Sequence, residues 1–144
     1  LVPELLELVG LGNVGKRRVE TFSKGMKQRL QIARALLNDP EIIFLDEPSI
    51  GLDPVGALEL RNIIKELAKK GKTILLTTHY MAEAEELCDR IAIINQGEIV
   101  TCGTLPEIAS LISDEDRTKI LQDKVKEQKE IDVTLEDIYL HLVR

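Results

Sequence analysis

The sequence predicts an α/β fold with parallel strands and flanking helices. Two short apolar runs, residues 42–45 and 73–78, have the length and composition of strands that are buried on both faces. A helical pattern separates them, with Asp53 as its N-cap, Pro54 as its first residue and Gly71 as its C-cap. Because strands that alternate with helices form parallel sheets, this order predicts the fold class.

Turn residues and apolar periodicity predict the other elements. Further helices are expected over 1–9, 23–37, 81–88 and 105–112 and along the last ten residues, and two hairpin strands are expected over 91–94 and 98–101. Residues 113 to 130 carry six acidic and five basic side chains, a pattern typical of a solvated helix or linker. We therefore expect a main domain over 1–112, a charged helix or linker over 113–133, and a C-terminal docking helix over 134–144.

Composition excludes some classes of function. The net charge is −6, and with no Trp, two Tyr and two Phe the chain has few aromatic platforms, so no nucleic-acid partner is expected. The two cysteines, Cys88 and Cys102, and the two histidines have no zinc-binding spacing, and we expect no chemical role for either cysteine or for His141. Thiols without a disulfide framework, no secretory signal and no run of 18 apolar residues together indicate the cytoplasm.

The segment from Gly10 to Arg17 resembles a phosphate-binding loop only superficially. It reads G-x-x-x-x-G-K followed by Arg17, where such a loop has Ser or Thr. A guanidinium cannot ligate a cation, and the preceding residues favour a helix where a working loop follows a buried strand. We therefore expect a Gly-rich connection between two helices.

Two consecutive carboxylates follow the first apolar run. Asp46 and Glu47 come directly after residues 42–45, and Pro48 ends the strand. Ligands of open α/β sheets bind at the carboxyl ends of strands. There an Asp can hold Mg²⁺ through a water molecule, and a following Glu can activate an attacking water. Taken alone, the pair could also be a helix cap after an ordinary strand.

Flanking motifs identify this constellation more closely. Ser23-Lys24-Gly25-Met26-Lys27-Gln28 precedes it, Ser49-Ile50-Gly51-Leu52-Asp53 follows it, and His79 closes the next strand. In this order and spacing the four motifs resemble the ATP-binding domain of ABC transporters, from the signature motif onward. The resemblance covers residues 4–108 and, more weakly, the rest. The last helix, from Thr134 to Leu142, resembles that of multidrug, sodium or polysaccharide exporter ATPases.

The resemblance implies a role for each motif. Glu47 and His79 are expected to be catalytic, and Asp46 is expected to hold Mg²⁺ through water. Ser23, Lys24, Gly25 and Met26 are expected to face the γ-phosphate of ATP held by the opposite subunit of a head-to-tail dimer, and Asp53 to lie in the loop that crosses the same interface. Lys24 and Met26 stand where many members have Gly and Gln.

The resemblance also implies what the chain needs for activity. These residues lack the half of the domain that carries the phosphate loop and its strand. Because the binding of ATP and Mg²⁺ needs that half, the isolated chain is expected to be inactive as an ATPase. The expected function is that of the ATP-hydrolysing subunit of a transporter, bound to a transmembrane permease on the inner face of the plasma membrane. An ABC-type ATPase of translation or DNA repair and a catalytically dead binding module remain alternatives.

A missing strand has consequences for folding. In the family, the strand before the phosphate loop lies between the strands here at 73–78 and 91–95. Its absence leaves unpaired backbone groups at sheet edges, where they can pair with another chain. We expect the chain to pair 73–78 directly with 91–95, to displace the 91–101 hairpin, or to self-associate. The hypothesis is that the second or third outcome occurs and disturbs the geometry of the predicted catalytic residues.

Overall fold

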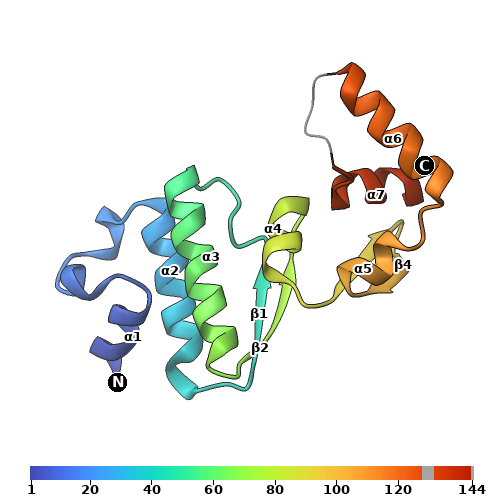
Figure 1. Cartoon of the computed structure of the whole chain (residues 1–144). Coiled ribbons are helices and arrows are strands. Elements are labelled where there is room, and N and C mark those ends of the chain that lie inside the picture. Colours follow the sequence, from blue (N-terminus) through green and yellow to red (C-terminus); the bar gives the residue numbers. More distant parts are fainter. Residues whose placement is uncertain (128–131, 144) are drawn as a thin grey trace. The chain divides into compact units, whose positions relative to one another are not determined.

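The chain divides into two units in the computed structural model, which describes residues 1–127 and 132–143 (Figure 1). One unit runs from Leu1 to His79 and the other from Tyr80 to Arg144. This boundary differs from the boundaries of the predicted segments 1–112, 113–133 and 134–144. The predicted segments describe domain organisation and stay a prediction. Each unit has a set of buried apolar side chains of its own.

The first unit packs helices on one face of a two-stranded sheet, with α2 and α3 side by side (Figure 1). Its buried side chains include Ile32 from α2, Leu45 from β1 and Leu60 from α3. Its elements, in chain order, are α1 (Val2–Leu8), the 3₁₀ turns η1 (Gly12–Val14) and η2 (Val19–Thr21), α2 (Lys24–Ala35), η3 (Leu36–Asn38), β1 (Ile42–Asp46), α3 (Pro54–Lys69) and β2 (Thr73–Thr77).

The two strands of this unit are parallel, which confirms the predicted arrangement. Ile42 lies opposite Thr73 and Asp46 lies opposite Thr77, so both strands end at the same level. Helix α3 connects them, beginning at the predicted cap Asp53, whose Oδ1 accepts a hydrogen bond from the Gly56 amide at 3.0 Å. The carboxyl ends of β1 and β2 therefore lie at one edge of the sheet.

The prediction that these strands are buried on both faces is wrong. Ile43 and Leu45 are buried, but Ile42 is 55% exposed and Phe44 is 73% exposed. On the neighbouring strand, Leu75, opposite Phe44, is 56% exposed. Strand side chains alternate between faces, and the helices of this unit cover only one of them. An apolar face of the sheet is left open.

The second unit combines short helices with a β-hairpin. Its elements are α4 (Met81–Leu87), β3 (Ile91–Asn95), β4 (Glu98–Gly103), α5 (Leu105–Ala109), α6 (Asp114–Lys126) and α7 (Leu135–Val143). The predicted turn is present, with positive φ at Gln96 and Gly97, the conformation that suits a two-residue hairpin turn. Helix α6 lies in the charged segment 113–133, of which residues 128–131 are outside the described part of the chain.

The hairpin forms a sheet of its own. In the described part of the chain β3 pairs only with β4 and β2 pairs only with β1. Direct pairing of residues 73–78 with 91–95, one of the expected ways to close the sheet, concerns two different units and stays a prediction. Along the chain, helix α4 lies between β2 and β3. The outer edge of β2 carries backbone N–H and C=O groups with which another strand could pair.

Helix α7 packs against other elements of the second unit. Leu135 and Ile138 of α7 are each 1% exposed and belong to a buried cluster with residues from α4, β3 and α5. The Leu135 amide donates a hydrogen bond to the Glu85 side chain of α4. Helix α6 is attached to α7 by an ion pair of 2.7 Å between Lys124 and Asp137.

Acid should weaken this attachment. Burial alone would raise the pKa of Asp137, but hydrogen bonds from Lys124 and Thr134, with the charge of Lys124, outweigh burial and hold that pKa below its ordinary value. A lowered pKa contributes stability above the unfolded pKa of about 4, and this stability is lost as pH falls through the folded pKa.

We expect Asp137→Asn to lower the free energy of unfolding by about 1–3 kcal/mol at pH 7, since a charged hydrogen bond is lost. Urea unfolding between pH 7 and pH 3 measures this loss, and the gap to wild type should shrink towards pH 3. Asp123→Asn is the control, because Asp123 is 73% exposed in its contact with Lys126. Equal effects of the two substitutions would contradict the prediction.

Candidate functional site

The carboxyl ends of β1 and β2 bring the predicted catalytic side chains together. Asp46 is the last residue of β1, Glu47 follows it, and His79 lies two residues beyond β2. The His79 Nδ1 atom is 2.9 Å from Oε2 and 3.0 Å from Oε1 of Glu47. The two residues that are expected to be catalytic, Glu47 and His79, are therefore in direct contact within one unit.

The backbone conformation at Glu47 explains how two consecutive residues can both place their carboxylates at one edge of the sheet. Glu47 has a φ of 47°, in the left-handed region that few non-glycine residues adopt. Its amide still donates to the Thr77 carbonyl at 2.9 Å, and its carbonyl accepts from the Ile50 amide at 3.2 Å. The chain thus turns sharply while Glu47 stays attached to β2. Such a conformation costs about 1–3 kcal/mol and is typical of functional sites.

Thr77 is a residue of this edge to which the sequence analysis assigned no role. Its hydroxyl donates a hydrogen bond to Asp46 Oδ1, and its carbonyl receives the Glu47 amide described above. The signal was present in the sequence as a Thr at the end of the second strand. Only the register, which places Thr77 opposite Asp46, makes it informative.

The predicted phosphate-facing residues lie at the start of α2. Ser23 is the N-cap, and its Oγ accepts a hydrogen bond from the Met26 amide at 3.2 Å. The positive end of the helix dipole and its unpaired amides favour an anion at such a position. The cap is confirmed, whereas anion binding by Ser23, Lys24, Gly25 and Met26 stays a prediction.

A loop from Ser49 to Leu52 packs against this helix start. Gly51 has a φ of +69°, and a side chain at this position would collide with the Lys24 ammonium group. A methyl group at Gly25 would meet Leu52 only at 3.7 Å, which is an ordinary contact. The motif around Ser23 and the loop before Asp53 are therefore in contact within this chain.

The segment from Gly10 to Arg17 adopts the expected connection between helices. Helix α1 precedes it, and Gly12–Val14 forms a 3₁₀ turn. Arg17 is exposed, and its amide donates to the Val14 carbonyl at 2.9 Å. No strand leads into the segment, so it does not have the strand–loop–helix order of a phosphate-binding loop.

Asp46 is suited to a magnesium ion whose other ligands come from elsewhere, not to a complete metal site in this chain. Among residues 1–127 and 132–143 no three His, Cys, Asp or Glu side chains form a group that could hold a metal. Mg²⁺ usually keeps several waters and takes one or two carboxylates together with substrate phosphates. The single Asp46 carboxylate at the end of β1 suits that arrangement.

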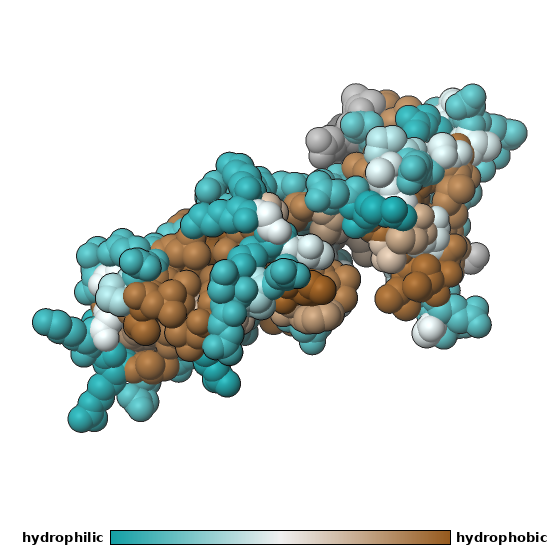
Figure 2. All heavy atoms as spheres, turned by 90° about the horizontal axis from the view of Figure 1, so that it is seen from below, coloured by the Kyte–Doolittle hydropathy of each residue, from teal (hydrophilic) through white to brown (hydrophobic). Residues whose placement is uncertain are grey.

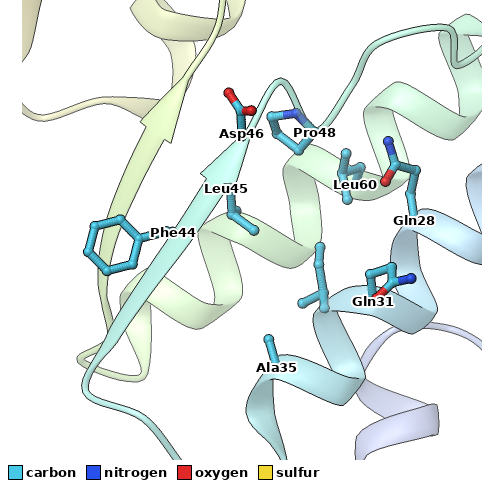
Figure 3. Close-up of a pocket in the computed structure, with 9 residues that line it drawn as sticks. Gln28, Gln31, Ala35, Phe44, Leu45, Asp46, Pro48 and Leu60 are labelled. Atoms are coloured by element: carbon cyan, nitrogen blue, oxygen red, sulfur yellow. The ribbon is translucent and has the colours of Figure 1, made fainter.

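A small pocket lies beside this edge, between β1, α2 and α3 (Figure 3). Its volume is about 200 Å³. Leu45 points towards the helices, whereas Phe44 points away from them to the open face (Figure 3). The lining residues are Gln28, Gln31, Ile32, Ala35, Phe44, Leu45, Asp46, Pro48 and Leu60.

The cysteines and His141 show no catalytic arrangement. Burial, with the nearby charges of Glu83 and Asp89, raises the pKa of the Cys88 thiol and so disfavours a reactive thiolate. Cys102 accepts a weak contact of 3.9 Å from Arg90, and His141 lies 3.7 Å from Asp116.

In the described residues, no helix is both long and apolar enough to cross a bilayer.

Comparisons with known proteins converge on one family. A protein-family model described as "ABC transporter" matches residues 2–50. An ABC transporter ATP-binding protein of Nostoc sp. (strain PCC 7120) is 52% identical over 109 residues, which are 74% of this chain and 32% of that protein. A linearmycin resistance ATP-binding protein of Bacillus subtilis (strain 168) is 46% identical over 107 residues, 74% of this chain and 34% of that protein.

Solved structures agree with these relatives. The ADP conformation of an ATP-binding cassette of an ABC transporter matches with a TM-score of 0.69 and 29% identity, covering 83% of this chain and 47% of that one. The chain therefore spans about a third of the length of the two relatives and about half of this structure.

Proposed function

We propose, from the premise that this chain belongs to the ABC transporter ATP-binding family, that it contributes the hydrolytic residues of a transport ATPase. The observation that carries the proposal is the contact between Glu47 and His79 beside Asp46 at the carboxyl ends of two parallel strands. Glu47 is the general base, His79 orients its carboxylate and the reacting groups, and Asp46 serves the metal.

The chemistry follows from the positions of these groups. Bound Mg-ATP supplies the phosphate bond to be broken and a cation that offsets phosphate charge. Glu47 would accept the proton of an attacking water as a general base. His79 contacts both carboxylate oxygens of Glu47 through Nδ1 and would hold that carboxylate in position for the water. Asp46 accepts from the water molecules around the cation.

The phosphate-binding loop is, in this proposal, supplied from outside these 144 residues. We further propose that Ser23 to Met26 act on nucleotide held by a second ATPase subunit in a head-to-tail dimer, and that Asp53 belongs to the same interface. The free amides at the start of α2 support this assignment. The ATPase subunit would bind a transmembrane permease at the inner face of the plasma membrane, and ATP hydrolysis would drive transport through that permease.

The rival functions are less well supported. Asp46, Glu47 and His79 are all present and two of them are in contact, which disfavours a catalytically dead binding module. The relative from Nostoc sp. is described as an ABC transporter ATP-binding protein and the one from Bacillus subtilis as a linearmycin resistance protein. These descriptions favour a transporter over an ATPase of translation or DNA repair. The assignment to the multidrug, sodium or polysaccharide exporter subfamily stays a proposal, which the linearmycin resistance protein supports for the drug exporters.

The proposal is tested by reconstitution. Residues 1–144 are combined with a polypeptide that carries a G-x-x-x-x-G-K-[ST] loop from the same gene neighbourhood, and we call this combination the reconstituted ATPase. Phosphate release should need both parts, and calorimetry of residues 1–144 alone should show no micromolar ATP affinity. Turnover by the phosphate-loop part alone, at the rate of the combination, would reject the proposal.

We also propose that the isolated chain self-associates through the open face of the first unit. Apolar side chains are visible on the molecular surface (Figure 2), and Ile42, Phe44 and Leu75 are all more than half exposed on this sheet face. The outer edges of β1 and β2 add free backbone donors and acceptors.

Phe44→Lys should shift the chain from oligomer to monomer, because burying a lysine ammonium in such an interface is costly. Sedimentation velocity over a concentration series measures the shift. Val19→Lys is the matched control, since Val19 is 48% exposed in the same unit but lies outside the sheet. A monomeric wild-type chain at every concentration would contradict the proposal.

A further inference from the structure

We propose that Thr77 is a positioning residue for Asp46, whose hydroxyl holds one carboxylate oxygen so that the other stays directed to magnesium-bound water. The part of this inference that concerns the metal rests on the proposed function. The part that concerns the orientation of Asp46 rests on the geometry of the two strands alone.

The parallel register brings the two side chains together. Asp46 and Thr77 are the last residues of β1 and β2 and lie directly opposite each other. Thr77 Oγ1 donates to Asp46 Oδ1. Both side chains are exposed, and the χ1 torsion of an exposed side chain can occupy several staggered rotamers. The hydroxyl therefore removes freedom that Asp46 would otherwise have.

Thr77 is suited to this task by its own constraints. A β-branched side chain has few χ1 rotamers, so its hydroxyl stays where the backbone places it. The Thr77 backbone is fixed in turn, because its carbonyl accepts the Glu47 amide at 2.9 Å. Thr77 thus contacts both residues, the Asp46 carboxylate through its side chain and the Glu47 backbone amide through its main chain.

In this arrangement Asp46 can still accept hydrogen bonds from water molecules bound to a cation. An ionised carboxylate has about four acceptor sites, and one donor occupies only one of them. Groups that orient metal-binding side chains typically change metal affinity by about 10- to 100-fold when they are removed. Because this hydrogen bond is exposed, we expect a loss of about 10-fold.

The alternative explanation is that Thr77 is only a good strand residue. Val has the same shape and an equal or better preference for strands, but no hydroxyl. Thr77→Val therefore removes the hydrogen bond and keeps the strand, whereas Thr77→Ser keeps the hydroxyl and removes a methyl group. A structural role alone predicts that Val is tolerated better than Ser.

The first experiment needs neither metal nor nucleotide. Side-chain couplings of Asp46, measured by NMR on residues 1–144, should report one rotamer in wild type and in Thr77→Ser, and averaged rotamers in Thr77→Val. Unchanged couplings in Thr77→Val would overturn the proposal.

The second experiment measures the affinity of the ATP-loaded reconstituted ATPase for Mn²⁺ by electron paramagnetic resonance. We expect Thr77→Val to weaken Mn²⁺ binding about 10-fold and Thr77→Ser to rescue it to within about twofold. Equal affinities of the Val and Ser variants would overturn the role towards the metal. Absence of Mn²⁺ binding by wild type would instead reject the proposed function, and the NMR result would still decide whether Thr77 orients Asp46.

Discussion

Replacing Glu47 by Gln in the reconstituted ATPase should abolish most ATP hydrolysis and leave ATP binding intact. A positioned general base contributes about 10²–10⁴ to a rate, and the amide keeps the size of the side chain but cannot accept the proton. Gln also occupies the same backbone position at φ 47° with a similar cost, so the fold should be retained. Steady-state phosphate release and nucleotide binding by calorimetry measure the two effects.

The control for this prediction is Glu41→Gln. Glu41 is exposed and precedes β1, at the opposite end of the strand from Glu47. Only its backbone carbonyl is used by the sheet, as an acceptor for the Thr73 amide at 2.9 Å. Glu41→Gln should therefore keep wild-type turnover. A Glu47→Gln variant within threefold of wild-type turnover would mean that Glu47 is not the base.

Replacing Gly25 by Asp should be nearly as damaging, for an electrostatic reason. An added carboxylate about 5 Å from a phosphate costs about 3 kcal/mol at an effective dielectric constant of about 20, equivalent to a rate loss of about 100-fold. The fold should tolerate the change, because Asp is favourable in the first turn of a helix and Gly25 has space for a Cβ atom. Hydrolysis measures the loss, and thermal unfolding confirms the fold.

Gly25→Ala separates charge from size. It adds the same Cβ atom 3.7 Å from Leu52 without a charge, and it should retain most activity. Mixing Gly25→Asp subunits with Glu47→Gln subunits then tests action across the dimer. If Ser23 to Met26 act on nucleotide of the opposite subunit, mixed dimers regain one working site. Equal loss of ATP binding to a single subunit and of turnover would argue against action across the dimer.

Local sequence signals predicted much of the fold and of the site. Asp53 and Ser23 cap helices as expected, because a cap depends on a few consecutive residues. The parallel pairing of β1 and β2 followed from a strand–helix–strand order. Helix ends were less accurate: α2 gives way to a 3₁₀ turn at Leu36, and α5 ends at Ala109, because the last turn of a helix depends on its surroundings.

The open sheet face could not be predicted from an apolar run. Ile42 and Phe44 are as apolar as Ile43 and Leu45, and composition cannot say which face of a strand another element covers. The same limit applies to the sheet edges. Within the two units, β2 pairs with β1 and β3 pairs with β4, and an apolar run does not say which strand becomes its neighbour.

The sequence by itself determined which chemical groups this protein offers and in which order: a capped helix start at Ser23, two carboxylates after a strand, and a histidine after the next. Spacing along the chain is enough for this, because strand ends and helix starts are local features. Only the tertiary structure decided which groups meet. The parallel register places Thr77 opposite Asp46, and the left-handed turn at Glu47 brings its carboxylate to His79. Contacts between residues 31 and 32 positions apart depend on strand pairing, which no single stretch of sequence encodes.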